Sequence, residues 1–155
     1  MQHPGDGWVE CSCGQRHWGL NGAAGLLLVR RGQPQQILLQ LRSAMSHHGG
    51  TWGLPGGARA DGETWEQAAL REAQEEAGIN PEAVRILSTT LVDHGPWAYA
   101  TVLAVDDGTS TPHATDRESD LIEWVAVDEV ADRNLHPGFA ASWDASRERL
   151  RAAFL

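Results

Sequence analysis

Apolar runs separated by polar, glycine-containing segments predict several β-strands in this chain. The runs Ala23–Arg30 and Gln36–Arg42 flank the turn sequence RGQPQ and predict a β-hairpin, although leucine-rich runs of this length also fit a buried helix. Three further runs carry enough β-branched residues to predict strands: Val84–Asp93, Ala98–Asp106 and Leu121–Val127. The polar segment 107–120 is predicted to be a loop between the last two strands.

A helix is predicted between Thr64 and Gly78. Thr64 and Gln67 have the spacing of a capping box, and Gly78 suits the left-handed position that ends a helix. Within this segment apolar residues recur every four positions and form one narrow stripe, made of Trp65, Ala69, Ala73 and Ala77. Small alanines would let the helix lie close to a sheet. A second helix is predicted from Pro137, with apolar contacts at Phe139, Trp143, Leu150 and Phe154.

The chain has 155 residues, which is enough for one hydrophobic core. Residues 1–22 are rich in Gly, His and Trp and predict an irregular N-terminal arm, whereas residues 23–155 predict a single α/β domain. No segment has the composition of a signal peptide. The longest apolar runs, AAGLLLV and QILLQL, are far shorter than the ~20 residues needed to cross a bilayer. We therefore expect a cytoplasmic protein with no membrane partner.

The charge balance bears on the kind of partner. The formal net charge is −9, and all 12 basic residues are arginines. Sequence-independent binding to nucleic acid depends on a cationic surface, so no duplex partner is expected. A small phosphorylated compound can still bind an acidic protein through a metal ion. The composition thus favours metal chemistry on a small molecule.

The N-terminal arm carries a C-x-C-x3-H motif, made of Cys11, Cys13 and His17. A structural zinc ion requires four ligands, and the nearest fourth candidate is His3. A zinc site is therefore one of two interpretations. The preferred one is a pair of free thiols in an arm whose tryptophans, Trp8 and Trp18, pack against the core.

Three glutamates, Glu72, Glu75 and Glu76, would share one side of the first helix, within an arc of roughly 100°. Like charges at this spacing cost roughly a few tenths of a kcal/mol per pair. A divalent cation would offset this repulsion, because hard ions such as Mg²⁺ bind through carboxylates and share their remaining coordination with water and substrate phosphates. A solvated acidic helix face is the alternative.

The glutamates are part of a longer pattern, in which the fixed positions are Gly57, Glu63, Arg71, Glu72, Glu75, Glu76 and Gly78. This pattern resembles the signature of the Nudix hydrolases, G-x5-E-x7-R-E-U-x-E-E-x-G-U, where U is a bulky aliphatic residue. Ala73 holds the first U position, a departure that bears on packing beneath the helix and leaves the acidic residues in place. The preceding WGLPGG and the later LIEWVAVDEV and LHPGF are also similar to MutT-type members of the family.

The resemblance implies an α/β/α sandwich with a mixed central sheet and a hydrolase that requires Mg²⁺ or Mn²⁺. Glu75 and Glu76 would hold the metal with a backbone carbonyl of Gly56 or Gly57, and Glu72 would be a further ligand or the general base. Arg71 would orient the carboxylates, Glu63 in particular, through a bidentate ion pair.

Other residues are assigned less directly by the resemblance. Glu123 on the late strand would supply a further carboxylate to the metal or to the attacking water, with Glu118 as the competing candidate. Arg42 would clamp a phosphate, or it is an ordinary surface arginine. The base of the substrate would face a pocket built from Asn134, His136 and Phe139. Two further histidine sites, the pair His47 and His48 and the single His94, could border the substrate.

The substrate class implied by the resemblance is a nucleoside diphosphate linked to another group. The MutT-like segments favour (deoxy)nucleoside triphosphates, cleaved to a nucleoside monophosphate and pyrophosphate. ADP-ribose, nucleotide sugars and dinucleoside polyphosphates are alternatives within the same chemistry. A non-catalytic nucleotide-binding Nudix module is the alternative from another class, and either a monomer or a homodimer is expected.

Overall fold

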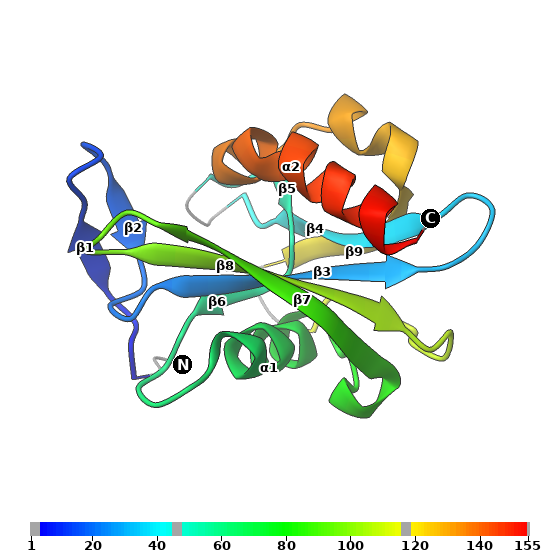
Figure 1. Ribbon diagram of the computed structural model, residues 1–155, viewed down its shortest axis with the longest axis horizontal. Helices are drawn as coiled ribbons and strands as arrows, with labels where there is room; N and C mark the ends of the chain where they lie inside the picture. The colour runs from blue at the N-terminus through cyan, green and yellow to red at the C-terminus, as the bar shows by residue number, and fades with distance from the viewer. Residues whose placement is uncertain (1–3, 45–47, 116–118, 155) are drawn as a thin grey trace.

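A mixed, seven-stranded sheet forms the centre of the molecule (Figure 1). The computed structural model describes residues 4–44, 48–115 and 119–154. The sheet has the order β5-β4-β3-β8-β7, with β6 paired to β3 and β9 paired to β4. Strands β3 and β8 are parallel, and the other pairs are antiparallel. The strands are β3 (Ala23–Arg30), β4 (Gln36–Arg42), β5 (Trp52–Gly53), β6 (Gly56–Ala58), β7 (Val84–Asp93), β8 (Ala98–Asp106) and β9 (Ser119–Ala126).

Helix α1 (Trp65–Ala77) covers one face of the sheet and α2 (Pro137–Ala153) covers the other (Figure 1). Residues of β3 alternate between two cores: Leu26 and Leu28 belong to the core under α1, whereas Leu27 and Val29 belong to the core under α2. A strand buried on both faces reads as a continuous apolar run. The α/β/α sandwich predicted from the family resemblance is confirmed.

Local sequence sets both ends of α1. Thr64 accepts a hydrogen bond from the Gln67 N–H while the Gln67 side chain accepts one from the Thr64 N–H, as the capping box predicts. Gly78 ends the helix with φ of 69°, in the left-handed region. Ala73, in place of the usual bulky aliphatic residue, is fully buried. The small side chain is therefore accommodated by close packing of the helix on the sheet.

The predicted strands are confirmed, and the leucine-rich runs 23–30 and 36–42 are strands, not helices. Pairing decides this, because β3 pairs with β8 along one side and with β6 and β4 along the other. The last predicted strand begins two residues earlier than expected, at Ser119. Two short 3-10 helices, η1 (Pro81–Ala83) and η2 (Val127–Asp132), complete the elements after α1.

The N-terminal arm departs from the prediction that it is irregular. Strands β1 (Trp8–Glu10) and β2 (Arg16–Trp18) form a separate antiparallel sheet of two strands. Three-residue strands in a glycine-rich segment have too little periodicity to be recognised from sequence. Trp8 and Trp18 do not pack against the core as expected: they are 39% and 40% exposed and contact each other edge-to-face at 5.2 Å.

Some sequence predictions lie outside the described residues, namely those on His3, His47 and Glu118. Among the helices of the described ranges, none combines the length and the apolar character needed to cross a membrane.

Candidate active site

The three glutamates of α1 differ in burial although they share one side of the helix. Glu76 is 2% exposed and Glu72 is 9% exposed, whereas the Glu75 side chain is 39% exposed. The Gly56 N–H donates a hydrogen bond to Glu76 Oε2 at 3.1 Å. Buried carboxylates are costly unless hydrogen bonds or cations compensate them. The arrangement is therefore suited to holding a cation against the β6 backbone.

Glycine at positions 56 and 57 lets the β6 backbone approach these carboxylates. A Cβ at Gly57 would lie 2.7 Å from the carboxylate carbon of Glu72, and a Cβ at Gly56 would lie 2.3 Å from the Ala24 carbonyl oxygen. Any side chain at either position would displace a strand or a carboxylate. The two glycines thus allow the β6 backbone to lie close to Glu72 and Glu76.

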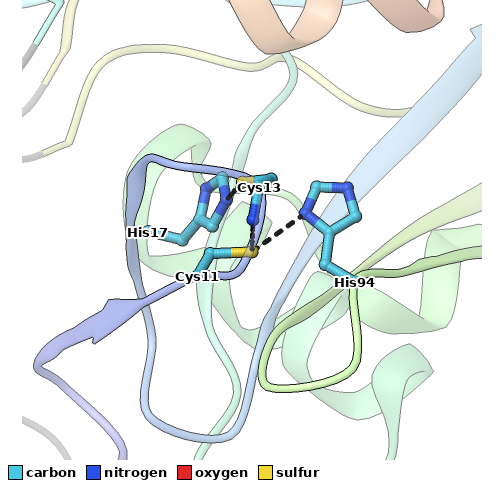
Figure 2. Close-up of side chains that lie close together, drawn as sticks. All are labelled: Cys11, Cys13, His17 and His94. Atoms are coloured by element: carbon cyan, nitrogen blue, oxygen red, sulfur yellow. Dashed lines mark hydrogen bonds between the residues drawn. The ribbon is translucent and has the colours of Figure 1, made fainter.

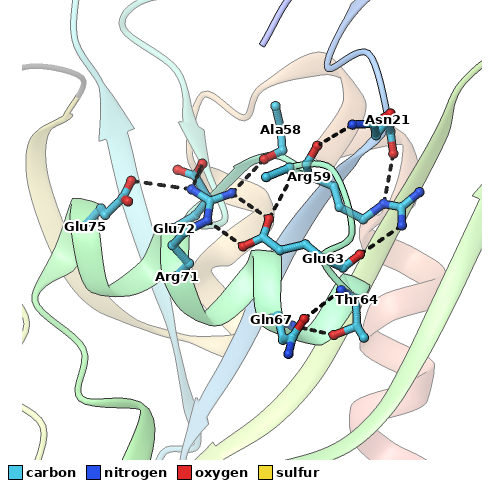
Figure 3. Close-up of polar contacts among 10 residues, drawn as sticks. Asn21, Ala58, Arg59, Glu63, Thr64, Gln67, Arg71, Glu72 and Glu75 are labelled. Carbon is cyan, nitrogen blue, oxygen red and sulfur yellow. Dashed lines mark hydrogen bonds and ion pairs between the residues drawn. The ribbon is translucent and has the colours of Figure 1, made fainter. Parts of the chain in front are cut away.

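Arg71 joins the carboxylates into one network (Figure 3). Its Nε donates to Glu63 Oε2 at 2.7 Å, its Nη2 donates to Glu63 Oε1 at 2.9 Å, and its Nη1 donates to Glu72 Oε1 at 2.9 Å. Nη1 also lies 3.6 Å from Glu75 Oε2, and Nη2 donates to the Ala58 carbonyl. The hydrogen bonds to Glu63, with the charge of Glu72, raise the pKa of Arg71 above its usual range. The predicted bidentate pair between Arg71 and Glu63 is present in the structure.

Replacing Arg71 should affect both stability and activity. Arg71→Ala leaves Glu63 and Glu72 without their shared cation, and we expect a loss of about 2–3 kcal/mol in the free energy of unfolding, less than for a fully buried pair. Arg71→Lys should recover part of this loss, because lysine keeps the charge but does not match the two carboxylate oxygens. Urea denaturation and kcat measure both effects. Arg151→Lys, at an exposed position, is the control. An Arg71→Ala protein with unchanged stability and unchanged kcat would contradict the role of the network.

Tyr99 on β8 was not among the predicted site residues, yet its hydroxyl is coupled to the site. Burial, together with the charge of Glu76, raises the pKa of Tyr99 to about 12, and the charge of Arg42 opposes the shift. The hydroxyl group lies over Gly25, where a Cβ would come within 2.1 Å of it. Arg42 and Glu76 therefore act on the same hydroxyl group. Sequence alone did not place Tyr99 at the carboxylates, because only the parallel pairing of β8 with β3 brings it beside Gly25.

Glu123 is not brought together with the α1 carboxylates. Strand pairing sets Glu123 opposite Leu39, whose side chain belongs to the core under α2. Its neighbours Ile122 and Trp124 pack against the core under α1, and successive residues of a strand point to opposite faces. Glu123 also forms an ion pair with Arg133 at 2.9 Å. These observations argue against Glu123 as a metal ligand.

The predicted base pocket is assembled only in part. Backbone hydrogen bonds join Trp52 to Asn134 and to His136, so these residues do border the WGLPGG segment. His136 Nδ1 accepts a hydrogen bond from the Gly138 N–H at the start of α2, and its ring contacts that of His48 at 4.7 Å. Phe139 is 7% exposed and packs on Trp143 in the core, so it offers no stacking surface.

Two other segments lie where sequence did not place them. His94, considered as a border of the substrate pocket, instead lies beside Cys11 in the N-terminal arm.

The polar loop after β8 covers the C-terminus of α1: the N–H groups of His113 and Thr115 donate to the carbonyls of Ala77 and Glu76. The last carbonyl groups of a helix have no hydrogen-bond donors within the helix, and the N–H groups of this loop act as those donors.

A sandwich with buried carboxylates against a glycine-rich strand defines a candidate metal-dependent hydrolase, and similarity to known proteins identifies the class. A family model described as NUDIX domain matches residues 19–146. The chain therefore belongs to the Nudix family, and it is a hydrolase of that family.

Individual relatives agree with this assignment. The chain is 50% identical over 158 residues to putative 8-oxo-dGTP diphosphatase 3 of Mycobacterium tuberculosis, covering 96% of the chain and 70% of that protein. It is 47% identical to a nucleoside triphosphate pyrophosphatase/Nudix hydrolase fusion protein of Bifidobacterium longum, covering 97% of the chain but only 32% of that protein's length. The crystal structure of RenU, a Nudix hydrolase from M. smegmatis, superposes with a TM-score of 0.89 at 45% identity, covering 97% of the chain and 98% of RenU.

Proposed function

We propose that this chain is a divalent-cation-dependent hydrolase of nucleoside diphosphate-X compounds, and that its substrates are (deoxy)nucleoside triphosphates. The observation that carries the proposal is the set of three α1 carboxylates, in which Glu72 and Glu76 are buried, Arg71 holds Glu72 and the Gly56 N–H holds Glu76. The name of the M. tuberculosis relative, an 8-oxo-dGTP diphosphatase, supports a triphosphate with a damaged base. ADP-ribose, nucleotide sugars and dinucleoside polyphosphates are the alternative substrates.

The donor set fits Mg²⁺ or Mn²⁺. Hard cations of this kind prefer carboxylate and carbonyl oxygens, and Glu72, Glu75 and Glu76 supply carboxylates beside the backbone of Gly56 and Gly57. When bound, such a cation neutralises charge on the phosphates and lowers the pKa of the attacking water. Nudix hydrolases as a family use divalent metals of this kind. The particular ion is part of our proposal.

The neighbouring residues give the three carboxylates different roles. The Gly56 N–H fixes Glu76 in one orientation, and Arg71 fixes Glu72. An ion pair stabilises the ionised carboxylate, so it weakens Glu72 as a proton acceptor and favours its role as a ligand. Glu75 is the most exposed of the three and is the better placed to face substrate and water. Arg71 and Glu63 act as positioning residues in this scheme.

The phosphate chain would lie between the α1 carboxylates and Arg42. The charges of Arg42 and Glu76 both act on the Tyr99 hydroxyl, so the Arg42 charge is within electrostatic reach of the site, and arginine is suited to clamp a phosphate there. The base would point towards Asn134 and His136, which border the strand β5. This orientation places an inner phosphorus near the carboxylates, and water attack there releases a nucleoside monophosphate and pyrophosphate.

The position of bond cleavage tests this proposal. A library of nucleoside triphosphates, including 8-oxo-dGTP, is incubated with the protein and Mg²⁺ in ¹⁸O-labelled water, and both products are examined by mass spectrometry. We expect a nucleoside monophosphate and pyrophosphate, with the label in one of them. Release of orthophosphate from the γ position would mean that the substrate lies in a different register. Binding without turnover of any nucleotide would favour the non-catalytic module.

The remaining expectations stay predictions within this proposal. They are a cytoplasmic location, a monomeric or homodimeric state, and a division of the chain into an arm of residues 1–22 and a catalytic domain of residues 23–155.

A further inference from the structure

A second cluster of metal-binding side chains lies at the N-terminal arm (Figure 2). Cys11 and Cys13 lie in the turn between β1 and β2, His17 lies on β2, and His94 lies in the turn that follows β7. One ligand atom from each of the four residues lies within 4.8 Å of the others. Sequence offered only three of these ligands, because the fourth is brought in from the far end of the β7–β8 hairpin.

The spacing of the ligand atoms suits a tetrahedral zinc ion. Cys13 Sγ lies 3.1 Å from His17 Nε2, and Cys11 Sγ lies 3.6 Å from His94 Nδ1. Zinc–sulfur and zinc–nitrogen bonds in a tetrahedron imply roughly 3.3–3.8 Å between ligand atoms. The Cys13 N–H also donates to Cys11 Sγ at 3.4 Å, a contact that stabilises a thiolate. The four side chains therefore need little movement to close around an ion.

Neighbouring aromatic residues hold the histidines in place. The His17 ring stacks on Trp97 with centroids 4.1 Å apart and an interplanar angle of 14°. The Trp97 indole N–H donates to the Trp18 carbonyl at 3.2 Å, and the His94 N–H donates to the Trp97 carbonyl at 2.8 Å. Contacts of this kind orient metal-binding histidines and are part of a built site. Residues of both hairpins contribute to them.

Within the described residues, stacking of His17 on Trp97 and the hydrogen bond from Trp97 to Trp18 attach the N-terminal hairpin to the β7–β8 turn. Each strand of the hairpin has three residues, and in the part of the chain that the structure describes they pair with no strand of the main sheet. Its larger apolar side chains remain exposed, with Trp8 at 39%, Trp18 at 40% and Leu20 at 55%. Small units that bury little apolar surface are commonly stabilised by a metal or a disulfide. A metal shared with His94 would tie this hairpin to the domain.

We propose that Cys11, Cys13, His17 and His94 form a structural zinc site that joins the N-terminal hairpin to the turn between β7 and β8. Two sulfur and two imidazole ligands favour zinc among the common divalent ions. Four protein ligands complete the coordination and leave no position for substrate, so the site is structural and not catalytic. The proposal reverses the preference for free thiols that sequence alone supported, and it does not depend on the proposed substrate.

Metal content of the wild-type protein is the first test. The protein is purified without chelators and without metal-affinity chromatography, and its zinc content is measured by inductively coupled plasma mass spectrometry. We expect about one zinc ion per chain after dialysis against Mg²⁺. Titration of metal-free protein with Co²⁺ should produce the intense visible bands and the sulfur charge-transfer bands of tetrahedral thiolate coordination. Absence of zinc together with absence of these bands, or a disulfide between Cys11 and Cys13, would overturn the proposal.

Matched variants then separate this site from the carboxylates of α1. His94→Ala and Cys11→Ser should lose the zinc and lower Tm by several degrees, whereas Ser12→Ala and His113→Ala should keep both. Glu76→Gln should also keep the zinc. Retention of zinc in His94→Ala and Cys11→Ser, or its loss only in Glu76→Gln, would assign the metal elsewhere. The cobalt spectrum of the wild-type protein decides the matter if a variant fails to fold.

Discussion

Omission of divalent cations should abolish hydrolysis of every nucleotide that this protein cleaves, and Mg²⁺ or Mn²⁺ should restore it. The reason lies in the charge of the site: Glu72 and Glu76 are buried, and the exposed Glu75 lies between them in the sequence, on the same side of α1. A phosphate chain would be repelled by these carboxylates unless a cation lies between them. Product release measured over a range of Mg²⁺ concentrations gives the dependence directly.

The control for this experiment takes the N-terminal cluster into account. A strong chelator would remove metal from both places, so Mg²⁺ is left out of gel-filtered protein and then added back, while Tm is followed in parallel. An unchanged Tm with an activity that follows Mg²⁺ assigns the effect to the α1 site. Full turnover in the absence of divalent cations would defeat the assignment of the carboxylates to a metal site.

Glu76→Gln should lower kcat by more than the roughly 10–100-fold typical of losing a residue that only supports a ligand. The substitution keeps the size of the side chain and an oxygen that can accept the hydrogen bond from the Gly56 N–H. It removes the negative charge that a hard cation requires. We therefore expect a folded protein with little activity, and steady-state kinetics with circular dichroism measure the two properties.

Glu66→Gln is the matched control for Glu76→Gln. Glu66 lies in the first turn of the same helix, and it accepts a hydrogen bond from the Thr89 hydroxyl on β7. Glu66→Gln removes the same charge at a variable position of the Nudix box, between Glu63 and Arg71. Glu66→Gln should retain activity. Equal loss in both variants would point to the overall charge of α1 and not to a particular ligand.

Local interactions explain why so much of the candidate site was readable from sequence. The box residues lie within 23 positions, and their geometry follows from one helix and the strand that precedes it. The capping box at Thr64 and the glycine at 78 fix the ends of that helix, so its period places three carboxylates on one side. Arg71 reaches Glu63 because both belong to the same short segment.

Residues far apart in sequence were assigned less well, since their positions depend on strand pairing. The register of β9 against β4 turns Glu123 to the face under α2. The packing of α2 buries Phe139 in the core, although its spacing fitted a pocket as well as a core. Tyr99 gains its place only through the parallel pairing of β8 with β3.

Sequence by itself determined the five longer strands of the main sheet, the limits of α1, the acidic side of that helix and the family, because each depends on short-range spacing. Tertiary structure alone decided which face each strand residue occupies, and it brought His94 within 3.6 Å of Cys11. Cys11 and His94 are 83 positions apart in the sequence, and they meet because β7 pairs with β8 and because the β1–β2 hairpin contacts the β7–β8 hairpin. Local propensity carries no information about such contacts, because they depend on how separate elements pack against one another.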